Sequence, residues 1–190
     1  MTARPFARLA SVALLALAAG CSDHRPAATS DNSATQPATG SATDWTVHLK
    51  AAGPIRFGMS LGEARQATGN VLGGGQGAVG CAYVEPPGVP PGMLFMVENA
   101  RVVRVDVDST GVRTDRGAGV GMSEADVRAL YPGGLAVQPH KYDSTGRYLI
   151  YAPSEPADSS YRLVFETDGR IVRRFRAGLR PAVEYVEGCS

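Results

Sequence analysis

Alternation of apolar and polar residues predicts a series of short strands after residue 44. Residues 45–49 show this two-residue period, and residues 135–138 and 147–151 are further predicted strands. Two further pairs of apolar segments are separated by short polar turns, which is the pattern of a β-hairpin. The first predicted hairpin joins residues 93–97 to 101–107, and the second joins 161–166 to 170–176 through Asp168-Gly169.

Two other segments have the three-to-four-residue spacing of a short helix with a narrow apolar face. The apolar positions are Leu61, Ala64 and Ala67 in the first segment and Val127, Leu130 and Tyr131 in the second. Each helix could cover one side of a small sheet. The pattern therefore predicts an α+β fold of two tandem modules, each with a short helix on a small antiparallel sheet. Module one covers about residues 45–110 and module two about residues 115–190.

An internal repeat supports this division. The segment "FGMSLGEARQATG" (57–69) matches "VGMSEADVRALYP" (120–132), and "ENARVVRV" (98–105) matches "TDGRIVRR" (167–174). The first copy contains Gly-x-Ser-x-Gly, the spelling of a serine-hydrolase nucleophile elbow centred on Ser60. The second copy keeps Ser123 but lacks the second glycine. Catalysis by Ser60 would leave Ser123 unexplained.

Helix capping explains both serines. A serine before an apolar run accepts hydrogen bonds from the unpaired N–H groups of the first helical turn. Glu63 lies three residues after Ser60 and completes a capping box, and Asp126 is a shorter equivalent after Ser123. We therefore predict that Ser60 and Ser123 are N-cap residues. Gly58 and Gly121 would permit the sharp turn into each helix.

The Gly-Met-Ser helix starts, each followed by strands and present in tandem, resemble those of BamE/SmpA-type outer-membrane lipoproteins and of secreted β-lactamase inhibitory proteins. That resemblance implies a helical part on an antiparallel sheet and a protein-binding role. No functional residue of those families has a matching position here. The segments "PHKYDSTGRYL" and "RPAVEYVEGC" also resemble uncharacterised xanthomonad-type lipoproteins, some of them labelled lectins.

The N-terminus has the pattern of a lipoprotein signal peptide. A basic start precedes an apolar run over residues 9–19, which is too short to span a bilayer as a mature helix. The run ends in Leu-Ala-Ala-Gly before Cys21, similar to a lipobox with the leucine one position early. We predict a signal peptide over residues 1–20 and lipid on Cys21. An ordinary signal peptide with a nearby cysteine is the alternative. The sorting rule of Gram-negative lipoproteins implies the outer membrane, because Ser22 follows the cysteine.

Residues 21–44 contain no large apolar side chain and predict a disordered, lipidated tether. The remaining residues, 45–190, are enough for one compact domain. The chain has 19 Lys and Arg against 18 Asp and Glu, so its formal net charge of +1 suggests no polyanionic partner such as nucleic acid.

Two cysteines remain after Cys21, which are Cys81 and Cys189. An oxidising compartment favours a bond between them, and we predict that disulfide. Two free thiols are the alternative.

Two polar clusters are candidate binding sites. The first is the loop His140, Lys141, Tyr142 and Asp143, which a solvated turn would also explain. The second is an arginine row on one face of the last predicted strand, suited to an anionic saccharide or lipid head groups. A soluble sheet face is the alternative. The members of this row are Arg170, Arg174 and Arg176.

The sequence shows no recognised metal motif and no set of acid, base and nucleophile. We therefore expect no cofactor, no metal and no catalytic residues. The function predicted first is a non-enzymatic envelope lipoprotein that binds another envelope or periplasmic protein as a scaffold, inhibitor or assembly partner. A carbohydrate- or cell-wall-binding, lectin-like module is the alternative.

Overall fold

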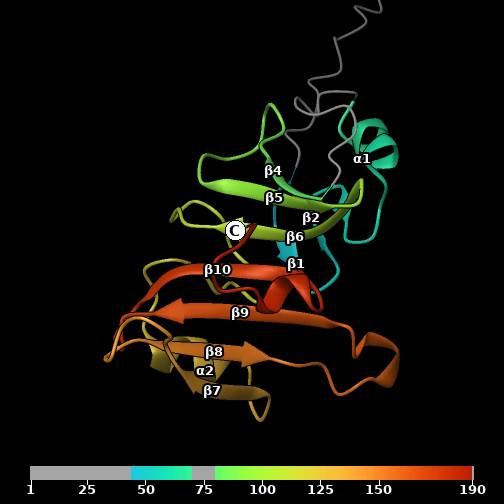
Figure 1. The fold of residues 1–190 in the computed structure, drawn as a ribbon. Coiled ribbons are helices and arrows are strands. Elements are labelled where there is room, and N and C mark those ends of the chain that lie inside the picture. The colour runs from blue at the N-terminus through green and yellow to red at the C-terminus, as the bar shows by residue number, and fades with distance from the viewer. Residues whose placement is uncertain (1–43, 70–79, 190) are drawn as a thin grey trace, which may run out of the picture. The chain divides into compact units, whose positions relative to one another are not determined.

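The computed structural model describes residues 44–69 and 80–189. Seven strands form one antiparallel sheet in the order β4-β5-β6-β10-β9-β8-β7 (Figure 1). The strands are β4 (Cys81–Val84), β5 (Met93–Glu98), β6 (Arg101–Val107), β7 (Leu135–Pro139), β8 (Arg147–Tyr151), β9 (Tyr161–Thr167) and β10 (Val172–Leu179). The predicted signal peptide, the lipidated Cys21 and nearly all of the predicted tether lie outside the described residues. No described helix has the length and hydropathy needed to cross a membrane.

The remaining elements are short. A small sheet has the order β1-β2-β3, and two α-helices and two 3-10 turns complete the described structure. Their bounds are β1 (Val47–His48), β2 (Ala51–Ala52), β3 (Ile55–Arg56), α1 (Leu61–Ala67), α2 (Glu124–Leu130), η1 (Pro156–Asp158) and η2 (Ala182–Glu184). The strand predicted over residues 45–49 is therefore shorter than its pattern suggests.

The prediction of two modules, each with a helix on its own small sheet, is wrong. The structure is mostly β, and β6 from the first predicted module pairs with β10 from the second. In this pairing Asp106 lies opposite Arg176, and Val105 lies opposite Ala177. Left apart, each strand would be a sheet edge with unpaired backbone groups. Pairing them satisfies both edges and produces one sheet through both segments.

Both predicted hairpins are confirmed. In the first, Asn99 and Ala100 connect β5 to β6 with φ values of 48° and 60°. Positive φ at both central residues is the geometry of the two-residue turn that matches the twist of paired strands. The second hairpin joins β9 to β10, and its turn contains Gly169 with φ of 88°. The turn residues therefore correctly predicted the pairing of β5 with β6 and of β9 with β10.

The repeat recurs in the hydrogen bonds that precede each helix. Gly58 N–H donates to the Val102 carbonyl at 2.7 Å, and Gly121 N–H donates to the Val172 carbonyl at 2.9 Å. The two glycines have φ values of 94° and 90°, a region that favours glycine. The sequence match pairs Val102 with Ile171, so the structural equivalent lies one residue later. The longer turn between β9 and β10 accounts for this extra residue.

The predicted N-caps are confirmed. The Ser60 hydroxyl accepts from Glu63 N–H at 3.2 Å, and the Glu63 carboxylate accepts from Ser60 N–H at 2.8 Å. These two bonds complete a capping box. The Ser60 N–H and hydroxyl both donate to the Glu63 carboxylate and lower its pKa. The Ser123 hydroxyl accepts from Asp126 N–H at 3.1 Å, but the shorter Asp126 side chain reaches only the hydroxyl. The second cap therefore lacks the reciprocal bond to the backbone.

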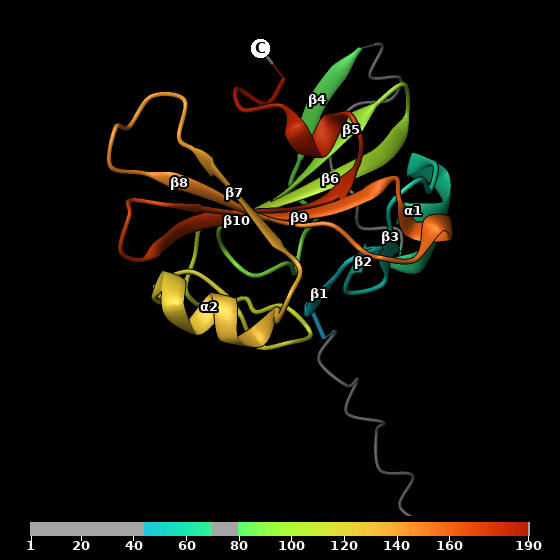
Figure 2. The same cartoon turned by 90° about the horizontal axis from the view of Figure 1, so that it is seen from below.

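The large sheet has two different faces. On the first, called the core face, Phe95, Phe165 and Phe175 pack with α1, α2 and the small sheet in one apolar cluster. Figure 2 shows α2 and the small sheet on that side, and η2 with the end of the chain on the other. We call the other side the second face and residues 182–189 the C-terminal segment. Burial on the core face removes apolar surface from water, which is the main favourable contribution to folding.

The predicted disulfide between Cys81 and Cys189 is confirmed. It joins edge strand β4 to the C-terminal segment across a sequence separation of 108 residues, with the two Cα atoms 5.3 Å apart. The C-terminal segment is consequently held over the second face of the sheet, where it contacts β6, β9 and β10 through η2.

Candidate functional site

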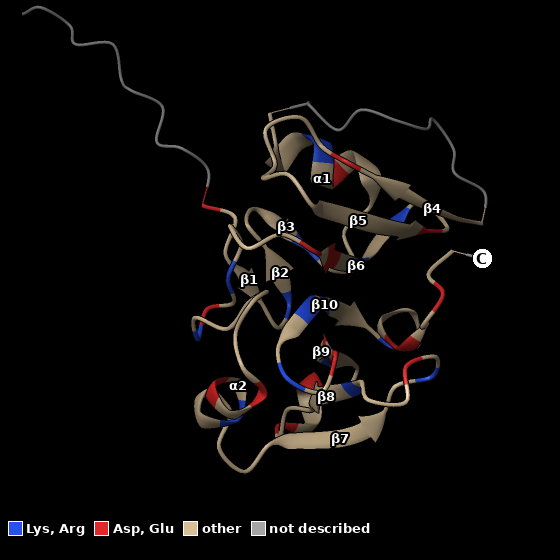
Figure 3. Cartoon of the chain, turned by 90° about the vertical axis from the view of Figure 1, so that its left-hand side faces the viewer, with Lys and Arg blue, Asp and Glu red and all other residues tan. Residues whose placement is uncertain are grey.

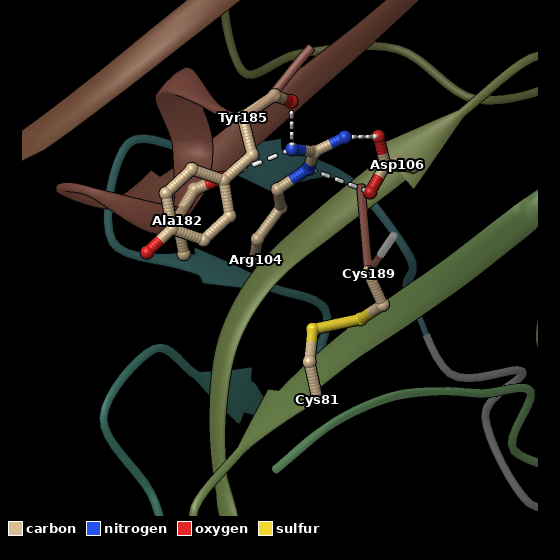
Figure 4. Close-up of a disulfide and its surroundings, with 6 residues drawn as sticks. All are labelled: Cys81, Arg104, Asp106, Ala182, Tyr185 and Cys189. Carbon is tan, nitrogen blue, oxygen red and sulfur yellow. Dashed lines mark hydrogen bonds and ion pairs between the residues drawn. A yellow bond between two sulfur atoms is a disulfide. The ribbon is translucent and has the colours of Figure 1, made fainter. Parts of the chain in front are cut away.

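The second face contains a buried arginine that holds the C-terminal segment in place. Arg104, from β6, forms a two-bond pair with the Asp106 carboxylate. Its Nη1 atom donates to the carbonyls of Ala182, at 2.9 Å, and Tyr185, at 2.7 Å (Figure 4). The Arg104 side chain is only 4% exposed. A guanidinium is permanently charged, so its burial requires acceptors, and these four hydrogen bonds supply them.

A second buried arginine, Arg176 from β10, lies beside the first. Its Nε atom donates to the Val183 carbonyl at 2.8 Å, and its Nη1 atom lies 3.3 Å from the Glu166 carboxylate. Its guanidinium also lies over the Tyr148 ring, 5.5 Å from the ring centre. Burial lowers the pKa of Arg176, and the nearby Arg104 charge acts in the same direction. Both arginines therefore serve to fix the C-terminal segment against the sheet.

Glu166 connects Arg176 to the predicted binding loop. The Nε2 atom of His140 lies 3.1 Å from the Glu166 carboxylate, and Nδ1 accepts from the N–H groups of Tyr142, at 3.1 Å, and Asp143, at 3.0 Å. Because Nδ1 is an acceptor, the proton lies on Nε2 and is donated to Glu166. The imidazole also stacks on Tyr148 at 4.8 Å. His140 therefore shapes the loop rather than presenting a free nitrogen to a ligand.

Two other loop residues do reach outward. Lys141 Nζ lies 2.7 Å from the Glu187 carboxylate, and the Tyr142 hydroxyl donates to the same group. The Tyr142 residue is 65% exposed. Asp143 is used locally, since its carboxylate accepts from the hydroxyl and the N–H of Thr145 and its pKa is lowered by them. The structure thus places Lys141 and Tyr142 against the C-terminal segment.

The predicted arginine row is wrong for Arg170. A β-bulge in β10 makes Val172 pair with Thr167 and Arg174 with Glu166, leaving one extra residue between them. The bulge reverses the expected alternation, and Arg170 lies in the turn before the strand. Arg174 and Arg176 line one cavity on the second face, whereas Arg170 lines another at the end of the sheet. The three side chains do not form a continuous row.

The cavity beside Arg174 has a volume of about 360 Å³. One wall is apolar, formed by Tyr83 of β4 and Leu94 of β5, and another is formed by the C-terminal segment. Burial raises the pKa of Tyr83 to about 12, so its phenol remains neutral. The Arg174 side chain is 59% exposed and lies 3.3 Å from Glu166. The cavity thus combines an apolar wall with a solvent-accessible cation and with carboxylates, which are those of Asp106, Asp108, Glu166 and Glu187.

Exposed apolar side chains gather around the same segment. The described residues have five large exposed ones, and four of them touch the C-terminal segment, line a cavity with it or belong to it. We call these four the tyrosine surface: Tyr83, Leu94, Tyr142 and Tyr185. Figure 3 shows acidic and basic residues intermixed among the described residues visible in that view.

Of the four residues of the tyrosine surface, only Tyr142 was predicted from the sequence as a binding residue. Tyr83 and Leu94 lie in apolar strands, and nothing in those strands indicates that they point away from the core. Among the described residues, no group of His, Cys, Asp or Glu side chains is arranged to hold a metal ion. No protein-family model matches the sequence, and no curated protein or solved structure shows significant similarity to it.

Proposed function

We propose that this chain is a non-enzymatic, lipid-anchored protein of the outer membrane whose domain binds another envelope or periplasmic protein. The observation that carries the proposal is the tyrosine surface. Exposed apolar side chains that cluster, rather than scatter, are typical of interaction sites. Here Tyr83 is 38% exposed, Leu94 37% and Tyr185 37%.

The chemistry of this surface suits a protein partner. Tyrosine and arginine are enriched among the residues that dominate binding energy, and Arg174 is accessible in the cavity beside Tyr83 and Leu94. Lys141 and Glu187 supply charged groups at the margin. An apolar centre with a polar rim is the usual anatomy of a protein interface.

In vivo photo-crosslinking tests this proposal. A photoreactive phenylalanine analogue replaces Leu94, which lines the cavity, and in a matched control it replaces Asp126, which is exposed on α2. We expect a discrete crosslinked protein from position 94 and not from position 126, with the partner identified by mass spectrometry. The purified partner should then bind the wild type and lose affinity for Leu94→Glu. Equal crosslinking from both positions would count against the proposal.

An acidic saccharide is the second candidate ligand. It is supported by the exposed Arg174 guanidinium, which opens into a cavity that has an aromatic wall. A glycan array with the purified domain distinguishes the two ligands. Specific saccharide binding that Arg174→Ala abolishes would favour the lectin-like function over protein binding.

The membrane anchor is tested separately. Cys21→Ala should release the protein from the membrane fraction and remove the acyl mass from its N-terminal peptide. Continued membrane fractionation with an unchanged peptide mass would contradict lipidation at Cys21, without bearing on the tyrosine surface.

A further inference from the structure

The strand β7 forms an edge of the large sheet, because it pairs only with β8. The direction of its backbone groups follows from the register. His140 N–H donates to the Gly146 carbonyl at 3.1 Å, which makes that pair a hydrogen-bonded one. Such pairs alternate along an antiparallel ladder. The N–H and carbonyl groups of Leu135 and Val137, and the carbonyl of Pro139, therefore point away from β8.

This edge lacks the usual protection against further pairing. Natural edges carry charges or proline, or are covered by other elements. The strand Leu-Ala-Val-Gln-Pro has no charged side chain, and its proline stands at the end. Val137 is 45% exposed. It is the one large exposed apolar residue among the described residues that does not belong to the tyrosine surface. Of the three residues whose backbone groups point away from β8, only Pro139 has no N–H group to donate.

A cavity of about 690 Å³ adjoins the edge, lined by Val137, Pro139, Arg147 and Arg170. Val137 pairs with the buried Leu149, so its side chain lies on the core face. A residue added opposite Val137 would place its side chain on the same face, next to this cavity.

The cavity carries an accessible positive charge. Arg170 is exposed, and its side chain forms no hydrogen bond or ion pair with any described residue. Arg147 is 47% exposed and bonds Glu124 at 3.2 Å. The one carboxylate in the lining, Asp168, is already engaged by Arg173 and by the N–H groups of Arg170 and Ile171. An acidic side chain entering the cavity would meet Arg170 without competing for another ion pair.

We propose that β7 accepts an extended segment of a partner protein as an eighth strand, with an acidic side chain of that segment placed beside Arg170. Main-chain hydrogen bonds to Leu135, Val137 and Pro139 supply the docking, and the cavity selects the acidic residue. This site is separate from the tyrosine surface and stands whether or not that surface binds a partner.

Hydrogen exchange measured by NMR tests the proposal with two synthetic probes, acetyl-Thr-Val-Glu-Val-Thr-amide and the same peptide with Gln in place of Glu. The Glu peptide should slow exchange of the Leu135 and Val137 amides by about tenfold at a concentration ten times its Kd. The Ala136 amide already bonds β8 and serves as the internal control. No slowing at Leu135 and Val137 would overturn the proposal.

Two variants separate the backbone and charge contributions. Arg170→Ala should weaken the Glu peptide by about two- to fivefold and leave the Gln peptide unchanged, while Arg56→Ala on β3 should alter neither. Val137→Pro removes only an outward N–H and should abolish binding of both peptides. If the proline variant does not fold, the proposal is still tested by Arg170→Ala and by the comparison of the Glu peptide with the Gln peptide.

Two further results would overturn part of the proposal. Equal affinity for the two peptides would overturn the acidic preference. Exchange at Leu135 and Val137 that slows with protein concentration alone would show that a second copy of the chain occupies the edge, which would overturn the assignment to a partner protein.

Discussion

Arg104 and Arg174 occupy equivalent positions in the two halves of the sheet, yet their environments differ. Each follows a β-bulge, and β6 and β10 pair around the Asp106–Arg176 position. The Arg104 side chain is 4% exposed and binds Asp106 and two carbonyls of the C-terminal segment. The Arg174 side chain is 59% exposed and has one carboxylate neighbour, Glu166.

The difference shows how two similar halves acquire different roles. The C-terminal segment crosses the second face and is fixed to the first half by Arg104 and by the disulfide at Cys81. The same segment leaves Arg174 at an open cavity. One arginine therefore contributes to stability, and its counterpart remains available for binding.

The sharpest test of this comparison replaces each arginine by alanine. Arg104→Ala leaves Asp106 and the carbonyls of Ala182 and Tyr185 without their donor, so the free energy of unfolding should fall by about 3–5 kcal/mol. Arg174→Ala should lower it by less than about 0.5 kcal/mol. Urea denaturation followed by circular dichroism measures both. Similar losses for the two variants would show that their environments are not different in solution.

The disulfide should have the next largest effect. The double variant Cys81→Ser, Cys189→Ser should lose about 2–4 kcal/mol, because the unfolded chain regains the freedom of a long loop. Amide exchange in residues 182–188 should rise at the same time, since one of the two attachments to the first half is gone. Non-reducing peptide mapping of the wild type supplies the control. Alkylation of both Cys81 and Cys189 in the wild-type protein would show that the disulfide does not form.

The first turns of the helices provide a third test. Glu124 begins α2 and is buried, whereas Leu61 begins α1. Glu124→Leu should lower the free energy of unfolding by about 1.5–3 kcal/mol at pH 7, because the hydrogen bond to Thr167 and the ion pairs to Arg147 and Arg128 are lost. Urea denaturation of both proteins measures the difference.

The same substitution has a pH signature. Burial alone would raise the pKa of Glu124, but Thr167 and the arginines outweigh it, and the pKa is lowered from its usual 4.5. The stabilisation is therefore present above that value and is lost as the pH falls through the lower folded pKa. The gap between the wild type and Glu124→Leu should narrow at acidic pH. A gap that stays constant would contradict a stabilising carboxylate.

The N-caps should have a smaller effect than Glu124. Ser60→Ala and Ser123→Ala should each cost about 0.5–2 kcal/mol, and aspartate at either position should restore most of the loss, since a carboxylate also accepts N–H bonds at a helix start. Thermal unfolding of the four variants measures this. Labelling of Ser60 by a fluorophosphonate probe, absent from its alanine variant, would instead identify a nucleophile.

Local features of the fold could be predicted from the sequence. The Gly-Met-Ser segments, the Asp168-Gly169 turn and the apolar runs of both hairpins determine nearby backbone geometry, and the structure agrees with them. The cysteine count also gave the covalent link between residues 81 and 189. Each of these inferences needs only neighbouring residues or a count.

Long-range features could not be predicted in the same way. Pairing of β6 with β10 depends on how two distant hairpins meet, and the complementary charges of Asp106 and Arg176 are evident only once the register is known. The bulge that separates Arg170 from Arg174 is one residue in an otherwise regular pattern. Which face Tyr83 and Leu94 occupy follows from those pairings. The tyrosine surface therefore could not be predicted without the strand order.

The opposed charges of Asp106 and Arg176, which are register partners where β6 meets β10, affect which strands can pair when several chains fold close together. Asp106 and Arg176 face each other where two equivalent strands meet. If β6 strands of two neighbouring chains paired in the same register, Asp106 would face Asp106, and two β10 strands would bring Arg176 against Arg176. Like charges directly opposite are destabilising. The opposed charges thus favour pairing of β6 with β10 within one chain over exchange of halves between chains, a discrimination that matters most when many copies fold at high local concentration.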